Sequence, residues 1–211
     1  MTSGQAVEAG SFYDRIADLY DITFKFNGYS RSLEHYLREH PLPLEPGAHI
    51  LDAGCGTGLL TFALMKALKI PVRITAVDLS ASSLAKAKRA ARKSFKNGHK
   101  VNFGQANVLA LPFADESFDM VVTSGVLEYV PLQEGLGELA RVIAPGGHLL
   151  HLPVIPTTMS KLLELMFRFK AHPPEEVEAN TRKFFRMIAN YRFPPLHPIG
   201  WTKTAILSQK I

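Results

Sequence analysis

A strand that runs into a glycine-rich turn and then a helix is the feature that most constrains this chain. Residues 50–58 read ILDAGCGTG, so a short apolar run leads directly to Gly54, Gly56 and Gly58. Glycine is needed where a sharp turn takes left-handed backbone angles, or where a ligand approaches bare backbone. The segment therefore predicts a strand–turn–helix unit whose turn can hold a ligand.

Strand and helix patterns alternate along the chain beyond this turn, which is typical of a mostly parallel α/β sheet. Ser11, Ser30 and Ser80 stand where side-chain caps would begin three of the helices. Strands are predicted over residues 48–54, 72–78, 100–106, 118–124, 147–153 and 202–210. Helices are predicted over residues 11–24, 30–40, 57–69, 80–95, 132–144, 159–170 and 174–190.

The glycine spacing differs from that of a dinucleotide-binding turn, and an acid follows it. Dinucleotide sites use G-x-G-x-x-G, whereas this turn reads G-x-G-x-G and has Leu59 at the third glycine position. The spacing argues against NAD and FAD. Asp78 ends the next predicted strand, where an acid can accept hydrogen bonds from both hydroxyls of an adenosine ribose. The alternative is a tight turn with a helix-capping aspartate and no ligand.

Several segments resemble, in order, the motifs of the class I S-adenosylmethionine (SAM)-dependent methyltransferases. They are residues 51–58 (LDAGCGTG), 76–80 (AVDLS), 104–130 and 138–150. The chain is most similar to the methyltransferases of ubiquinone and menaquinone biosynthesis and their small-molecule relatives, and the likeness is close over residues 12–153. It implies a Rossmann-like α/β fold. Its mostly parallel seven-stranded sheet would have the order 3-2-1-4-5-7-6 and an antiparallel last strand.

The resemblance also implies which residues bind SAM. Asp52 and Gly54 would lie near the methionine moiety, while Asp78 would hold the ribose and Leu79 would pack on adenine. Asn107 stands where the family usually has aspartate, and its carbonyl oxygen can still accept from the adenine amino group. The full set is Tyr20, Asp52, Gly54, Gly56, Asp78, Leu79, Asn107, Val108, Ser124 and Gly125.

The implied reaction moves the methyl group of SAM to a nucleophilic carbon, oxygen or nitrogen and leaves S-adenosylhomocysteine (SAH). An in-line displacement depends mainly on positioning, so a dedicated base can be absent. His151 is the first candidate for such a base because it stands near the carboxyl end of a predicted strand, and packing is its alternative role. Tyr20 and Glu128 are the next candidates.

The end of the fourth predicted strand narrows the chemistry further. Metal-dependent relatives place acidic ligands there, whereas this chain has Thr123, Ser124 and Gly125, so we expect no metal. The segment also lacks the Pro-Pro-aromatic motif of relatives that methylate amino groups of nucleic-acid bases. Two alternatives stay open. One is a non-catalytic module that binds SAM or a nucleotide. The other is an RNA methyltransferase, which only the net charge of +5 supports.

The segments outside the sheet-and-helix pattern indicate the acceptor. Residues 1–45 are expected to form an N-terminal helical lid, in which Tyr20 and Tyr13 share a helix face with Ile16, and residues 46–211 the SAM-binding domain. Residues 154–172, rich in Leu, Met and Phe, are expected to cap the substrate; an ordinary core helix and a membrane-surface helix are the alternatives for residues 159–170. Together these segments favour a small, hydrophobic or lipid-like acceptor such as a quinol, phenol, amine or phospholipid headgroup.

The composition indicates the cellular compartment and the kind of membrane contact to expect. Apolar residues make up 46% of the 211 residues, and no run approaches the ~20 apolar residues that span a bilayer. The N-terminus lacks the pattern of a secretory signal. Because Cys55 is the single cysteine, no intramolecular disulfide can form and a reducing compartment fits. We expect a cytoplasmic protein that can contact a membrane peripherally and does not bind nucleic acid. The sequence leaves its oligomeric state open.

Overall fold

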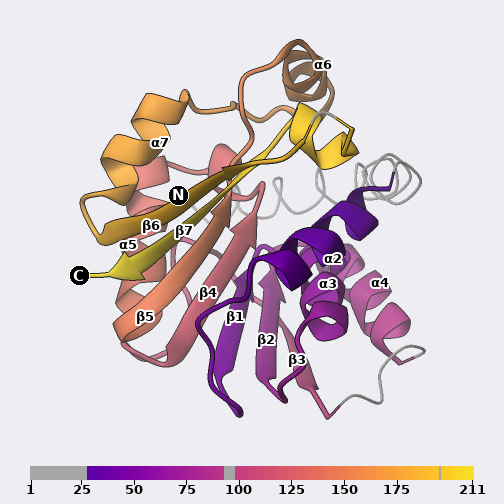
Figure 1. Ribbon diagram of the computed structural model, residues 1–211, viewed down its shortest axis with the longest axis vertical. Helices are drawn as coiled ribbons and strands as arrows, with labels where there is room; N and C mark the ends of the chain where they lie inside the picture. The colour runs from indigo at the N-terminus through magenta and orange to yellow at the C-terminus, as the bar shows by residue number, and fades with distance from the viewer. Residues whose placement is uncertain (1–27, 93–97, 195) are drawn as a thin grey trace.

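The computed structural model describes residues 28–92, 98–194 and 196–211, which form one seven-stranded sheet with helices on both faces (Figure 1). The predicted helix over residues 11–24 lies outside these ranges. The strands are β1 (His49–Ala53), β2 (Arg73–Asp78), β3 (Lys100–Gln105), β4 (Phe118–Ser124), β5 (Ile143–Leu152), β6 (Phe185–Arg192) and β7 (Thr204–Lys210). The α-helices are α2 (Tyr29–Glu39), α3 (Leu59–Ala67), α4 (Ala81–Ala91), α5 (Leu132–Val142), α6 (Thr158–Phe167) and α7 (Pro174–Thr181). Two 3-10 helices are η1 (Leu127–Tyr129) and η2 (Pro198–Trp201).

The strand order is β3-β2-β1-β4-β5-β7-β6, so the predicted order is confirmed. The first five strands pair in parallel, and the predicted antiparallel last strand is β7, which runs opposite to both β5 and β6. The chain builds outward from β1 on one side and then returns to add β4 on the other. Ligands of open α/β sheets bind beyond the carboxyl ends of the strands at such a switch point.

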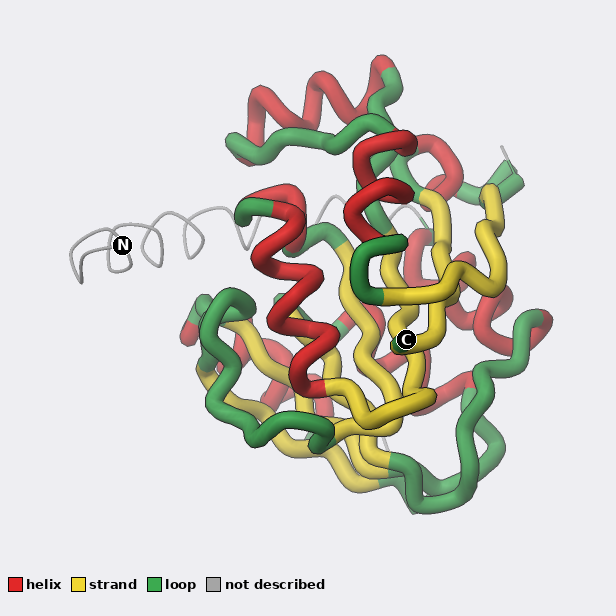
Figure 2. Tube along the Cα trace, turned by 90° about the vertical axis from the view of Figure 1, so that its left-hand side faces the viewer, coloured by secondary structure: helices red, strands yellow, loops and turns green. Residues whose placement is uncertain are grey.

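Two apolar layers enclose the sheet because successive strand residues point to opposite faces. Ile50 of β1 packs with α2 and α3, whereas its neighbour Leu51 packs with α5 on the other face. A smaller group around Ala76 of β2 packs against Leu84 of α4. Figure 2, turned by 90°, shows helices on both sides of the strands. Buried apolar strands covered on both faces are the expected state of a parallel sheet.

The N-cap residues of α4 and α2 show how the local sequence sets where a helix begins. Ser80 caps α4 as predicted, because its Oγ accepts a hydrogen bond from the backbone N–H of Ser83. The expected cap at Ser30 is wrong. Helix α2 begins at Tyr29, and Gly28 occupies the N-cap with the left-handed φ of 81°. Glycine takes this angle without a side-chain clash, so the helix starts one residue before Ser30.

The predicted helix over residues 174–190 is also corrected by the structure. Helix α7 ends at Thr181, and the second half of the segment forms the edge strand β6. Only Phe185 of β6 is fully buried, so the strand lacks the alternation that would have marked it. The fifth strand likewise begins earlier than predicted. Helix α5 ends at Val142, and β5 starts directly at Ile143.

Candidate active site

The glycine-rich turn connects β1 to α3 at the carboxyl edge of the sheet. Gly54, Gly56 and Gly58 have φ values of 75°, 54° and 91°, so all three take the left-handed conformation that favours glycine. A Cβ on Gly54 would lie 2.5 Å from the side chain of Val126, whereas a Cβ on Gly56 would meet nothing within 4 Å. Gly54 is therefore required by packing, and Gly56 leaves open space for a ligand.

Asp78 ties this turn to the end of β2. Its Oδ2 accepts a hydrogen bond from the N–H of Gly56 at 2.7 Å, and its Oδ1 accepts from the N–H of Ser80 at 2.9 Å. The N–H groups of Gly54 and Cys55 both donate to the carbonyl of Val77. The turn thus lies directly against the strand end that carries Asp78.

A cavity of about 180 Å³ opens between the turn, the end of β2 and the end of β4. It has the position expected for a ligand site at the switch point of the sheet. Tyr20 lies outside the described residues. All the other residues predicted to bind the cofactor lie together in the wall of this cavity. The residues brought together in the cavity wall are Asp52, Gly54, Gly56, Asp78, Leu79, Asn107, Val108, Ser124 and Gly125.

Asp52 is the buried acid of this cavity. Its carboxylate accepts a short hydrogen bond from the hydroxyl of Thr61. Burial raises the pKa of Asp52 to about 7; the hydrogen bond from Thr61 opposes this shift, and the charge of Asp78 adds to it. A cation bound nearby would favour the ionised carboxylate, so this part of the cavity suits a positively charged ligand group.

Tyr29 also lines the cavity, although the sequence did not predict it there. Its hydroxyl lies 3.3 Å from Ser124 Oγ and links the start of α2 to the end of β4. Tyr13 and Tyr20, which the sequence favoured, lie outside the described residues. The spacing of Tyr29, Leu33 and Leu37 marks an apolar helix face, and that pattern could have placed Tyr29 against the sheet.

The structure does not bring His151 to a cavity wall. The side chain is 1% exposed, and strand alternation places it on the same face of the sheet as Leu149, which packs with α5. Burial, together with Lys203 and His172, lowers the pKa of His151 to about 3. The imidazole is therefore neutral near neutral pH, and neither ring nitrogen has a hydrogen-bond partner within the described structure.

Glu128 is buried as well and does not line the cavity. Its Oε1 accepts a hydrogen bond from the N–H of Val154 at 2.5 Å and so ties η1 to the chain after β5. Its Oε2 has no partner among the residues that the structure describes. The catalytic roles assigned to His151, Tyr20 and Glu128 stay predictions.

A second, small cavity of about 20 Å³ adjoins the first. Gly125 and Tyr129 line both cavities. The remaining walls come mainly from the predicted cap segment, residues 154–172, and from the residues before β7. They are Val154, Leu163, Phe167, Phe169, Thr202 and Lys203. An apolar space therefore lies next to the end of β4.

Neither a metal-binding cluster nor a membrane-spanning helix is present within residues 28–92, 98–194 and 196–211. No group of three or more His, Cys, Asp or Glu side chains there could hold a metal ion. Within the same ranges, no helix is long and apolar enough to cross a membrane.

The sheet order, the glycine turn and Asp78 define a class I SAM-dependent methyltransferase fold. Residues 50–147 match the family model of the methyltransferase domain. Solved structures share the architecture: the [4+2]-cyclase SpnF superposes with a TM-score of 0.78 at 18% identity and covers 97% of this chain and 96% of its own. That likeness concerns the fold alone, because one fold carries many chemistries.

Sequence relatives define the family more narrowly. The demethylmenaquinone methyltransferase of Corynebacterium efficiens is 31% identical over 89% of this chain and 79% of its own length. The enzyme of the same name from Thermus thermophilus is 36% identical over 68% of this chain. The chain belongs to the SAM-dependent methyltransferases of the ubiquinone and menaquinone type. The match spans 64% of the Thermus thermophilus relative and 65% of one from Lactiplantibacillus plantarum.

Proposed function

We propose that this protein transfers the methyl group of SAM to a hydrophobic quinol-type acceptor. The observation that carries the proposal is the pair of adjoining cavities at the carboxyl edge of the sheet. One is walled by the glycine turn, Asp52 and Asp78, and the other by Leu, Phe and Tyr side chains. Relatives named demethylmenaquinone methyltransferase support a quinol as the acceptor.

The residues of the larger cavity fit SAM. Gly56 leaves room for the ligand beside the turn, and the Asp78 carboxylate stands where ribose hydroxyls can donate to it. Asp52 would meet the positively charged methionine end. Leu79, Asn107 and Val108 would enclose adenine; Asn107 already accepts a hydrogen bond from the N–H of Leu109, which fixes its amide.

Bound SAM supplies a methyl group on a sulfonium, which is already activated for displacement. The task of the protein is therefore to place the nucleophile in line with that methyl group and to exclude water. Ser124 and Gly125, at the end of β4, would lie beside the sulfonium. Gly125 also borders the smaller cavity, so an acceptor that enters this cavity would approach the methyl group of SAM from the side of the smaller cavity.

Two segments would cover the acceptor. Within residues 154–172, Leu163, Phe167 and Phe169 wall the smaller cavity. We assign this segment the role of substrate cap. We keep residues 1–45 as the lid, of which Tyr29 and Leu33 line the larger cavity. An apolar cover suits a quinol, whose ring is hydrophobic and whose hydroxyl groups are polar.

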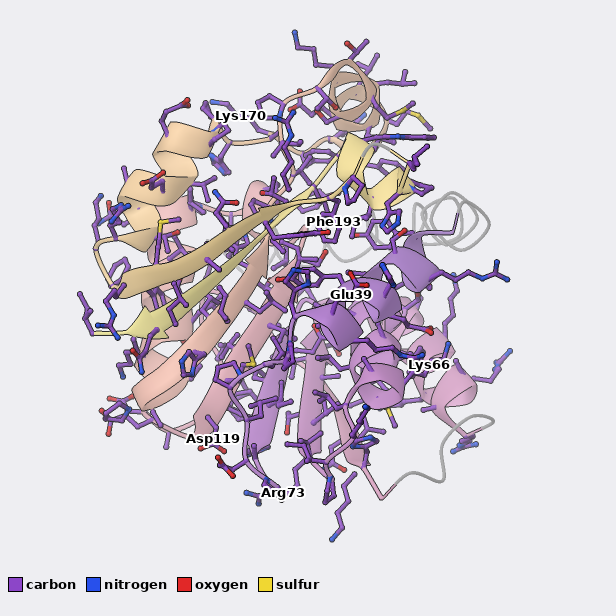
Figure 3. The ribbon with its side chains drawn as sticks, in the orientation of Figure 1. Glu39, Lys66, Arg73, Asp119, Lys170 and Phe193 are labelled. Atoms are coloured by element: carbon purple, nitrogen blue, oxygen red, sulfur yellow. The ribbon has the colours of Figure 1, made fainter. Side chains whose placement is uncertain are left out.

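The outer face of α6 fits peripheral membrane contact, which would give access to a lipid-soluble acceptor. Leu163 and Phe167 point inward, yet Leu162 and Leu165 on the opposite side are 54% and 81% exposed. Lys161 and Lys170 are exposed in the same segment, and Figure 3 places Lys170 far from Arg73 and Asp119 at the other edge of the sheet. An apolar face with basic neighbours suits an anionic lipid surface.

We also propose that no metal takes part. The end of β4 carries Thr123, whose hydroxyl donates to the carbonyl of Ala53, together with Ser124 and Gly125 rather than acidic ligands. Turnover should be unchanged by EDTA. Loss of turnover with the chelator, restored by Mg²⁺, would contradict this.

The proposed function is tested by measuring SAH release with a panel of acceptors. Reduced prenylated naphthoquinols and benzoquinols are compared with simple phenols, amines and phospholipids. We expect the prenylated quinols to give the fastest release. Turnover of phospholipids or amines alone, with none for quinols, would refute the quinol assignment. No observation favours an RNA substrate or a purely binding role over methyl transfer.

A further inference from the structure

Lys203 is a buried lysine beside the proposed acceptor site. It lies just before β7, where its N–H donates to the carbonyl of Ile199 and its backbone bridges to Val154. The side chain is 2% exposed. Lysine is almost never buried this deeply unless it is paired, because removing an ammonium group from water is costly.

The partners of Lys203 use little of its bonding capacity. Its Nζ donates to the carbonyl of Leu152 at 3.2 Å, and this is its one hydrogen bond within the described residues. An ammonium group has three N–H donors. Burial lowers the pKa of Lys203, and the charge of Glu128 opposes that shift. The site therefore holds a buried amino group most of whose hydrogen-bonding capacity is unused within the described residues.

Polar atoms around Lys203 also lack partners in the described structure. They include Oε2 of Glu128 and both ring nitrogens of His151, and Nε2 of His172 beyond them. Lys203 and His172 are both close enough to His151 to contribute to the lowering of its pKa. Buried polar groups in native proteins nearly always have partners. Of these groups, Lys203 lines a cavity, so its amino group is the one that a bound ligand group or a water can reach.

The position of Lys203 indicates which ligand group could form a hydrogen bond with it. Lys203 lines the small cavity, which shares Gly125 and Tyr129 with the proposed SAM cavity. The volume of about 20 Å³ accommodates one water-sized group. Apart from Thr202 and Lys203, the side chains of its wall are apolar or aromatic. One oxygen atom on an otherwise apolar molecule matches this size and polarity.

We propose that Lys203 forms a subsite that binds one anionic oxygen of the methyl acceptor, beside the position of the transferable methyl group. The inference rests on the proposed function and deepens it, because it defines the acceptor as a phenol or quinol bound through its ionised oxygen. Neutral amines and ethers would not satisfy the subsite. The titratable groups that interact electrostatically with Lys203 are Glu128 from η1 and His151 from β5, neither of which lines the cavity, and Tyr129 lines the cavity itself.

A cation at this point would activate the acceptor. An opposite charge within a few ångströms lowers the pKa of an acid by about 1–3 units. The phenolic O–H would lose its proton to solvent, and the electron pair would reach the adjacent ring carbon. That carbon forms its bond to the methyl group while the methyl–sulfur bond breaks, with its pair going to sulfur. The ring proton then leaves to solvent and aromaticity returns.

The test uses 4-methoxy-1-naphthol as a redox-stable probe in the presence of SAH. Ionisation of the bound probe is followed by its naphtholate absorption as a function of pH, and kcat/KM is measured with a prenylated naphthoquinol. Lys203→Met removes the charge at similar volume, and Lys203→Gln keeps a donor without charge. Lys183→Met, at an exposed lysine on the segment before β6, is the matched control. SAH affinity reports whether each variant has folded.

For the wild type and Lys183→Met, we expect the bound probe to ionise at least about one pH unit below its value in water. Both Lys203 variants should lose this shift and at least about tenfold in kcat/KM, while SAH affinity stays unchanged. An unchanged shift and kcat/KM in Lys203→Met would overturn the inference, since a water alone would then fill the cavity. In that case quinol turnover by the wild type would leave the proposed function intact. A wild type that neither binds the probe nor methylates any quinol would overturn both.

Discussion

We propose that Asp52 couples cofactor binding to pH. Its carboxyl is buried beside Thr61, and burial raises its pKa to about 7. The folded, ligand-free protein therefore holds this proton more tightly than the unfolded chain does. Its stability should fall as pH rises from about 4 to about 7, the window between the two pKa values. A cationic ligand would reverse this preference by favouring the ionised carboxylate.

We predict that SAM affinity rises with pH as Asp52 ionises, by up to about tenfold per unit between about pH 5.5 and 7. Calorimetry in buffers of different ionisation enthalpy should detect proton release on binding. Asp52→Asn should bind more weakly and lose this release, and the comparison separates Asp52 from the titrating amino group of SAM itself. Equal proton release in the wild type and the variant would contradict the role of Asp52.

Gly56 gives a second prediction at the residue scale. A Cβ there meets nothing within 4 Å in the ligand-free protein, so Gly56→Ala should fold and lose only about 1–2 kcal/mol to its left-handed backbone. The added methyl group would occupy the cofactor cavity, and SAM affinity should fall at least about tenfold, or by about 1.4 kcal/mol.

Gly47→Ala is the matched control. Gly47 has a φ of 87° with nothing within 4 Å, but it lies outside both cavities. It should cost similar stability without loss of SAM affinity. Equal affinity losses in the two variants would show that backbone strain, and not cavity filling, explains the effect.

The residues proposed to bind SAM could be predicted to lie together because their signals are local. Gly54, Gly56 and Asp78 stand at strand ends whose patterns are clear in the sequence, and the structure brings them together. Tyr29 and Lys203 could not be found in this way. Each reaches the site through a long-range contact, Tyr29 with Ser124 and Lys203 with Leu152. The apolar face of α2 predicts that Tyr29 packs on the sheet but not that it lines the cavity, and no short motif marks Lys203.

At the scale of elements, strands buried on both faces were the easiest to predict. The β4 segment is apolar throughout its centre, and its bounds match the prediction at both ends. The edge strand β6 was missed because only Phe185 is buried, and because α7 supplies a helical pattern just before it. Pairing with β7 fixes β6, and that pairing is not encoded locally.

At the scale of elements, we predict that helix α6 contacts the membrane. Replacing Leu162 and Leu165 together with Gln should reduce binding to vesicles of phosphatidylglycerol and phosphatidylcholine by at least about tenfold, because two large apolar side chains no longer enter the lipid. Turnover of a water-soluble, short-chain quinol should not change. Vesicle co-sedimentation measures the first effect and SAH release the second.

Ile188→Gln is the control, since Ile188 is 50% exposed on β6 and outside the α6 face. Its vesicle binding should match the wild type. If the double variant also binds vesicles like the wild type, α6 is not the membrane-contacting element.

At the scale of the whole molecule, the sheet brings distant segments to one edge. The glycine turn follows β1, Asp78 ends β2, Ser124 ends β4, and Lys203 precedes β7. The reversal of strand order at β1 and β4 leaves the cavity between them. In our proposal, the segment that contains α6 would close the side where the acceptor enters. The family resemblance predicted this order, whereas contacts across the edge required the structure.

The most direct test of the central claim follows the methyl group itself. The protein is incubated with SAM carrying a fully deuterated methyl group and with a reduced prenylated naphthoquinol, and the product is analysed by mass spectrometry and NMR. We predict that the intact deuterated methyl group appears on a ring carbon of the quinol, with an equal amount of SAH. A quinol fraction without label, from protein shown by calorimetry to bind SAM, would contradict the account.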